Sequence, residues 1–100
     1  MIKLTVLYET PADVEAFDAH YMGTHVPLAK AVPGIQRVEV TRFSPGADGS
    51  APRYHLMAEL YFPDAEAMQA ALGSPEGKEL GADVVNLGGT PATHLVGTVA

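Results

Sequence analysis

Alternation of apolar and polar side chains marks the first element of the chain. In residues 2–9, IKLTVLYE, every second position is apolar or aromatic: Ile2, Leu4, Val6 and Tyr8. Neighbouring side chains of a strand point to opposite faces, so this period of two predicts a β-strand. Residues 54–62 alternate in the same way, and further strands are predicted over residues 35–43 and 93–99.

Apolar residues spaced by three or four positions predict a helix after the first strand. Asp13 is a suitable N-cap, and the apolar stripe that follows it consists of Val14, Phe17 and Tyr21. Gly23 and Pro27 are expected to interrupt this helix. A second short helical turn, capped by Thr24, is expected to begin at Pro27.

The second half of the chain predicts two more helical segments. One begins after Pro63-Asp64 and buries Ala65, Met68 and Leu72. The other follows Ser74-Pro75-Glu76, which combines a cap, a proline at the first helical position and an acid in the first turn. Its inner face is expected to carry Leu80 and Val84, and Gly88-Gly89 ends it.

The predicted order of elements is β-α-β-β-α-β, in a single domain of residues 1–100. Two β-α-β halves that share one sheet predict an α+β, ferredoxin-like fold, with a four-stranded antiparallel sheet and the helices on one face. Residues 44–53, rich in Gly, Pro and Ser, are expected to form a mobile hairpin loop. Whether this loop gates a pocket is left open.

The sheet face without helices is expected to be mixed in character. Its positions include Thr5, Leu7, Met57 and Tyr61 among polar residues. A face of this kind suits a partner's sheet, which would make the protein a homodimer. Scattered surface hydrophobes also occur without a partner, so both interpretations stay open.

The composition and net charge of the chain argue against some classes of partner. The chain is 47% hydrophobic, 18% charged and free of cysteine, with 6 basic and 12 acidic residues and a net charge of −6. The basic residues are scattered, whereas nucleic-acid binding needs them clustered, so neither nucleic acid nor an anionic lipid surface is expected as a partner. We expect no disulfide, no membrane span and a cytoplasmic location.

The candidate chemistry lies in residues 17–28, FDAHYMGTHVPL. Tyr21 continues the stripe that faces the sheet, and His25 follows one turn later at the expected helix break. A histidine there can act as a general acid or base, with Tyr21 orienting it or polarising a carbonyl. A purely structural role for both residues is the competing interpretation, since a histidine near a helix end often binds a free carbonyl.

The other histidines are not predicted to act with His25. His20 and His25 are five positions apart, which puts them on different sides of an α-helix and argues against a metal site. His20 is expected to be exposed, His55 to lie on the sheet face opposite the helices, and His94 to be ordinary surface. No phosphate-binding loop and no serine-nucleophile motif is found, so no nucleotide cofactor is expected.

Two motifs give the chain a resemblance to a known family. The pattern F-x-x-x-Y-x-x-x-H-x-P-L followed by P-G is similar to the EthD family, and its residues here are Phe17, Tyr21, His25, Pro27, Leu28, Pro33 and Gly34. The segment AELYFPDAEAMQAALGSPEGKELGADVVNL also resembles that family, with Phe62, Met68, Ser74-Pro75-Glu76-Gly77 and Asp83 in matching places.

The resemblance implies a dimeric α+β barrel with a cavity between sheet and helices in each subunit. The family takes its name from a protein linked to bacterial ether degradation, and its relatives include cofactor-free monooxygenases, polyketide cyclases, lactone isomerases and heme-handling enzymes. No heme-ligand motif is found in this chain, and fold alone does not choose among these activities.

Three hypotheses follow for the cavity. In the first, a cytoplasmic enzyme of bacterial catabolism binds an apolar oxygenated molecule, aromatic or ketone-bearing, and works as a cofactor-independent oxidoreductase, cyclase or isomerase. Its catalytic residues are His25 and Tyr21, and its substrate-binding residues are Tyr8, Phe17 and Phe62. In the second, the protein is a non-catalytic binding or accessory module for a partner oxygenase. In the third, the dimer fills the cavity with its own side chains.

Overall fold

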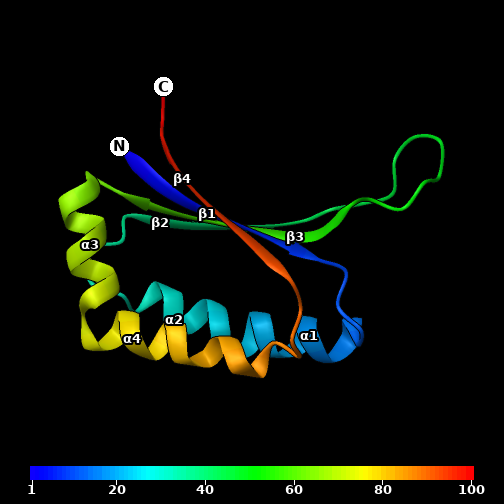
Figure 1. Ribbon diagram of the computed structural model, residues 1–100, viewed down its shortest axis with the longest axis horizontal. Coiled ribbons are helices and arrows are strands. Elements are labelled where there is room, and N and C mark those ends of the chain that lie inside the picture. The colour runs from blue at the N-terminus through cyan, green and yellow to red at the C-terminus, as the bar shows by residue number, and fades with distance from the viewer.

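The computed structural model describes all 100 residues and has one sheet and one layer of helices (Figure 1). The elements, in chain order, are β1 (Ile2–Glu9), α1 (Val14–His20), the π-helix η1 (Tyr21–His25), α2 (Val26–Lys30), β2 (Arg37–Arg42), β3 (Tyr54–Phe62), α3 (Ala65–Gly73), α4 (Pro75–Ala82), the 3-10 helix η2 (Asp83–Asn86) and β4 (Ala92–Thr98). The four predicted strands, and the helix starts at Asp13, Asp64 and Ser74, are therefore present, with small shifts at the strand ends.

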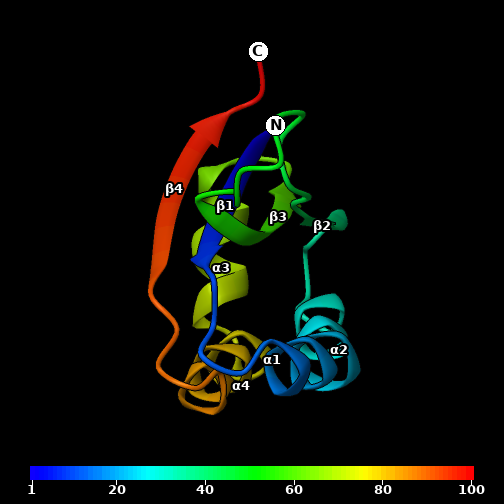
Figure 2. The ribbon, with the colours of Figure 1, turned by 90° about the vertical axis from the view of Figure 1, so that its right-hand side faces the viewer.

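The sheet is antiparallel throughout, in the order β2-β3-β1-β4. All helices lie on one face, with α2 beneath β2 and α4 on the side of β4 (Figure 2). The α3 helix runs between the sheet and α4 and closes one end of the space between the layers (Figure 1). This is the predicted α+β, ferredoxin-like arrangement, which the sequence pattern described correctly.

Side-chain caps fix three helix starts where the sequence places them. Asp13 accepts from the backbone N–H of Ala16, and Asp64 accepts from that of Ala67. Ser74 receives the N–H of Gly77 on its hydroxyl oxygen. Each cap satisfies a backbone donor that the first turn of a helix leaves unpaired.

The expected helix break at Gly23 and Pro27 is wrong. The chain stays helical from Val14 to Lys30, because the five residues Tyr21–His25 form a π-helix that joins α1 to α2. The N–H of Val26 bonds to the carbonyl of Tyr21, five residues back. As predicted, Pro27 stands in the first turn of a second short α-helical segment, α2, but Thr24 does not cap that segment.

The placement of His55 also differs from the prediction. The register between β1 and β3 shifts between Tyr8, which pairs with Leu56, and Glu9, which pairs with Tyr54. This irregularity leaves His55 as an extra residue on β3, and a bulge of this kind re-aims the side chain it carries. His55 Nε2 consequently lies 2.7 Å from Asp18 Oδ1 of α1.

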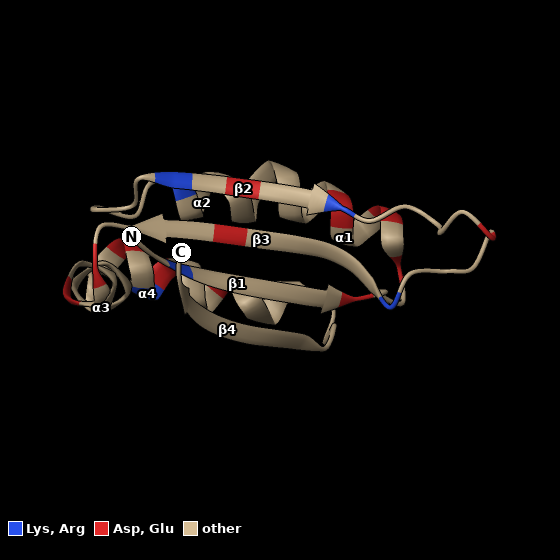
Figure 3. Cartoon of the chain, turned by 90° about the horizontal axis from the view of Figure 1, so that it is seen from above, with Lys and Arg blue, Asp and Glu red and all other residues tan.

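The core lies between the sheet and the helices, while β4 stays exposed along its length. Phe62, Leu56 and Tyr21 are the largest fully buried side chains. Every residue of β4 is exposed, including Leu95 at 53% and Val96 at 56%. Among the strands, β2 carries Arg37, Glu39 and Arg42, β3 carries Glu59 in its middle, β1 carries Lys3 and Glu9, and β4 carries no charged residue (Figure 3). No helix has the length and apolar composition needed to cross a membrane.

Candidate functional site

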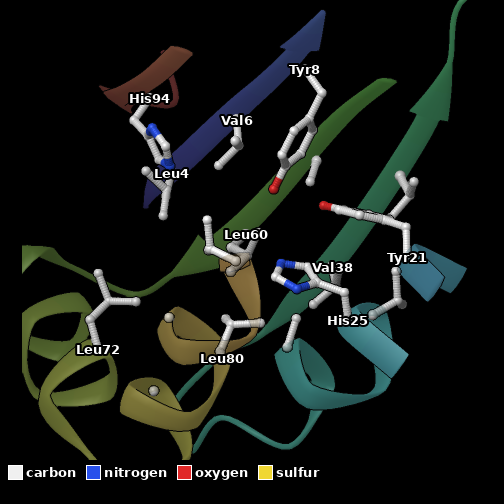
Figure 4. Close-up of a pocket in the computed structure, with 17 residues that line it drawn as sticks. Leu4, Val6, Tyr8, Tyr21, His25, Val38, Leu60, Leu72, Leu80 and His94 are labelled. Carbon is white, nitrogen blue, oxygen red and sulfur yellow. The ribbon is translucent and has the colours of Figure 1, made fainter. Parts of the chain in front are cut away.

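A largely apolar cavity of about 280 Å³ lies between the sheet and the helix layer. Thirteen of its 17 lining residues are hydrophobic, and they come from both layers (Figure 4). The sheet contributes Leu4, Val6, Tyr8, Val38, Val40, Ala58 and Leu60, and the helices contribute Tyr21, Val26, Ala29, Leu72, Leu80 and Val84. Apolar walls with a few convergent polar groups are typical of sites for small organic molecules.

The cavity has a closed end and an open end. Tyr8, Tyr21 and His25 are buried and form the closed end. The exposed lining residues are Gly81, Val84 and His94, and they mark the mouth between β4 and the α4–η2 segment. Polar atoms therefore lie at the closed end and at the mouth, with an apolar wall between them.

Asp83 holds His25 from behind the cavity wall. Its Oδ2 lies 2.8 Å from His25 Nδ1, and its two oxygens lie 2.9 and 3.0 Å from His20 Nε2. The side-chain amide of Asn86 donates to Oδ1 at 3.0 Å. The side chains of His25 and Asp83 are only 8% and 6% exposed, whereas that of His20 is 28% exposed. The network thus runs from the closed end of the cavity to the surface.

The π-helix explains why both histidines reach one carboxylate. In an α-helix of 3.6 residues per turn, residues five apart are separated by about 140° around the axis. The wider turn closed by the bond from Val26 to Tyr21 brings His20 and His25 to the same side. The expectation that these two histidines face different ways, with His20 exposed, is wrong for this reason.

Asp83 is a carboxylate over the whole physiological pH range. Burial by itself would raise its pKa, but hydrogen bonds from Asn86, His25 and His20 outweigh that effect and lower the pKa to about 2. An ionised carboxylate only accepts hydrogen bonds, so His25 Nδ1 carries the hydrogen. Nε2 of His25 has no partner within the chain and is not a fully buried atom. This nitrogen is therefore the one available to a molecule in the cavity.

Two tyrosines stand beside the free nitrogen. The ring of Tyr21 lies 4.8 Å from that of His25 and 5.2 Å from that of Tyr8, measured between centroids. The hydroxyls of Tyr8 and Tyr21 point toward one another into the cavity (Figure 4). Burial raises the pKa of both phenols, and that of Tyr21 rises well above its ordinary value. Both hydroxyls stay protonated and can donate hydrogen bonds to an oxygen atom.

Of the five predicted site residues, three line the cavity and two do not. Tyr8, Tyr21 and His25 line the cavity, whereas Phe17 and Phe62 do not. Phe17 packs behind the wall, 5.5 Å from Tyr8 and 5.4 Å from Tyr21 between ring centroids. Phe62 is fully buried in the core. Ligand contact by Tyr8, Tyr21 and His25 remains a prediction.

Sequence reasoning did not propose Asp83 as a site residue. It follows α4, 58 residues after His25, and no local spacing links the two. The available signal was the family resemblance, because Asp83 holds a place that matches the EthD pattern.

A second histidine–aspartate pair lies outside the cavity. His55 is bound to Asp18, and its ring contacts Phe17 edge-on at a centroid distance of 5.8 Å. Arg42 lies 3.6 Å from the other oxygen of Asp18. No three His, Cys, Asp or Glu side chains form a group suited to a metal ion.

Comparison with known proteins identifies relatives along almost the whole chain. An uncharacterized 11.0 kDa protein from the thcB-thcC intergenic region of Rhodococcus erythropolis is 37% identical over 95 residues, which cover 95% of this chain and 91% of that protein. The crystal structure of an EthD family protein from Bacillus halodurans has a TM-score of 0.92 and 39% identity, and the match covers 100% of this chain and 99% of that one.

A more distant structure shares only the fold. SnoaB, a cofactor-independent oxygenase from Streptomyces nogalater, has a TM-score of 0.70 and 16% identity over 98% of this chain and 91% of its own. The EthD domain pattern itself matches residues 9–90, a range that includes His20, His25 and Asp83. On this match and these relatives, the chain belongs to the EthD domain family.

Proposed function

We propose that the cavity binds an apolar ketone or phenol and that His25 moves a proton to or from it. The observation that carries this proposal is the single free nitrogen of a buried histidine whose other nitrogen is fixed by a carboxylate. Such a pair orients the ring and stabilises the imidazolium that forms when Nε2 accepts a proton. The apolar walls select the ligand class and keep water from competing.

The proposed step moves one proton and one electron pair. Neutral His25 takes a proton from the carbon next to a carbonyl, and the electron pair of the broken C–H bond moves onto the carbonyl oxygen as an enolate. A hydroxyl of Tyr8 or Tyr21 donates a hydrogen bond to that oxygen, where negative charge develops. The imidazolium keeps its Nδ1 hydrogen on Asp83 and returns the proton from Nε2.

The enolate can then be used in two ways. Return of the proton at another carbon isomerises the substrate. Attack of dioxygen on the electron-rich carbon begins a cofactor-independent oxidation, with dioxygen as the oxidant. The fold shared with SnoaB, described as a cofactor-independent oxygenase, supports the second outcome at the level of the fold.

Hydrogen exchange tests the proton step without knowledge of the natural substrate. The probe is 2-tetralone, whose protons on the carbon between ring and carbonyl are acidic and whose body is apolar. In D₂O, the protein should accelerate loss of the NMR signal of these protons over the buffer rate. General acid–base groups contribute about 10²–10⁴-fold, so His25→Ala should lose most of the acceleration.

A matched control is available in His55→Gln. His55 is also paired with a carboxylate and partly buried, yet it does not line the cavity. This variant should exchange 2-tetralone at the wild-type rate. Equal rates in the wild type and His25→Ala would contradict the proposal, even if the ligand binds.

The second candidate is a non-catalytic binding or accessory module for a partner oxygenase. The 13 hydrophobic lining residues favour it, because apolar walls serve storage as well as catalysis. Saturable binding of 2-tetralone with exchange at the buffer rate would select this candidate.

We also propose that two copies associate through the sheet face that carries no helices. Leu7 and Met57 are only half-buried there, and Leu95 of β4 is 53% exposed on the same face. Exposed apolar side chains gathered on one face favour association with another chain. Sedimentation velocity at several concentrations should give a species of twice the chain mass, and Leu95→Lys should shift it to a single chain.

A further inference from the structure

His94 is a polar side chain in the cavity that the proton step does not use. It belongs to β4, where it pairs with Val6 of β1. Paired residues of an antiparallel sheet share a face, and Val6 faces the helices. His94 is exposed and lines the cavity, so it belongs to the mouth rather than to the outer surface of the sheet.

The two histidines of the cavity lie at different ends. His94 projects beside Leu4 on one side, and His25 lies with Tyr21 and Tyr8 on the other (Figure 4). Apolar side chains, including Val6 and Leu60, occupy the wall between them. Tyr8, Tyr21, His25 and His94 supply all the polar side-chain atoms of the lining.

We propose that His94 binds a second oxygen of the ligand, so that the preferred ligand is an elongated apolar molecule with hydroxyl or carbonyl groups at both ends. This inference rests on the proposed function, because it concerns the same cavity. One oxygen would meet the tyrosines and His25, and the apolar body of the ligand would fill the middle. An imidazole can donate to or accept from the outer oxygen, so a hydroxyl and a carbonyl both suit it.

Binding of two isomers distinguishes a site with a polar group at each end from a site that merely prefers polar ligands. The hydroxyls of 2,6-dihydroxynaphthalene lie at opposite ends of the rings, and those of 2,3-dihydroxynaphthalene lie at the same end. The isomers have the same atoms and the same apolar body. Their affinities are measured by isothermal titration calorimetry at constant salt and pH, with the wild type, His94→Phe and His94→Gln.

The wild type should bind the 2,6 isomer about five- to tenfold more tightly than the 2,3 isomer, the effect of one net hydrogen bond. His94→Phe keeps a ring but has no polar nitrogen. It should therefore remove this preference by weakening the binding of the 2,6 isomer alone. His94→Gln keeps a hydrogen-bonding group and should retain part of the preference. Thr93→Ala, at the neighbouring position on the opposite face of β4, should bind both isomers like the wild type.

Equal affinity of the wild type for the two isomers would overturn the inference. An equal loss of affinity for both isomers in His94→Phe would also overturn it. Either result, together with accelerated exchange of 2-tetralone, leaves the proposed function standing. If neither isomer binds and 2-tetralone exchanges at the buffer rate, the proposed function fails and the inference fails with it. Circular dichroism of each variant checks that it is folded.

Discussion

Replacement of Gly77 by alanine has two opposing effects on stability: it raises helix propensity, and it introduces a steric clash. Gly77 lies in the first turn of α4, buried against the end of α3. A Cβ atom at this position would lie 2.7 Å from the carbonyl oxygen of Leu72, 2.8 Å from its carbonyl carbon and still closer to the carbonyl oxygen of Ala71. These are backbone atoms, so relief requires a shift of α3 relative to α4.

The clash is expected to exceed the gain in helix propensity. Alanine is more favourable than glycine in a helix by about 1 kcal/mol, and overpacking costs about 1–3 kcal/mol. Contact with three backbone atoms puts the cost near the upper end, so the free energy of unfolding should fall by about 2 kcal/mol. In a 100-residue domain this corresponds to a fall in Tm of roughly 10 °C.

Gly81→Ala is the matched control in the same helix. A Cβ atom there meets nothing within 4 Å, so only propensity acts and stability should rise by about 0.5–1 kcal/mol. Urea unfolding followed by circular dichroism, with all proteins at one concentration, measures both changes. A Gly77→Ala protein as stable as the wild type would refute the packing argument, and so would two variants that shift in the same direction.

Three further predictions concern the site and the core. Asp83→Asn should slow the exchange of 2-tetralone at least tenfold, since the amide can leave the hydrogen on the wrong nitrogen of His25; an unchanged NMR rate would contradict this. Because the pKa of Asp83 falls to about 2 from an ordinary 3.8, its carboxylate stabilises the fold by up to about 2 kcal/mol above pH 4. In urea titrations, the stability difference between wild type and Asp83→Asn should shrink as the pH falls from 4 toward 2. Phe62→Leu should lower stability by about 1–2 kcal/mol without changing the affinity for 2,6-dihydroxynaphthalene; a weaker calorimetric affinity would show that Phe62 shapes the cavity.

The features that the sequence predicts correctly are those that depend on local chemistry. Strand periodicity and the helix caps at Asp13, Asp64 and Ser74 follow from side chains a few residues apart. Tyr21 and His25 were placed together for the same reason, because they share one helical stripe. The long-range contact of His25 with Asp83 joins segments 58 residues apart, and no pattern in a single chain specifies it.

Two of the wrong local predictions, the placements of His20 and His55, have a common physical cause. Both predictions assume a regular period, 3.6 residues in the helix and two in the strand. The chain departs from each period by one residue, in the π-helix and in the bulge near Glu9. In both places the extra residue turns a histidine toward an aspartate, to Asp83 for His20 and to Asp18 for His55. Irregularities of this kind concentrate at functional sites.

The π-helix also bears on how the chain tolerates a change in length. A π-turn is equivalent to an α-helix with one residue inserted, and the wider turn absorbs that residue, so the helix beyond it keeps its orientation. Gly23 sits inside the turn, and a side chain there would meet nothing within 4 Å. Deletion of Gly23 would leave the two histidines four positions apart in an ordinary α-helix, about 40° apart around its axis, so both would still face the carboxylate of Asp83. The π-turn therefore lets the chain carry one more residue between the two histidines without loss of the carboxylate that they share.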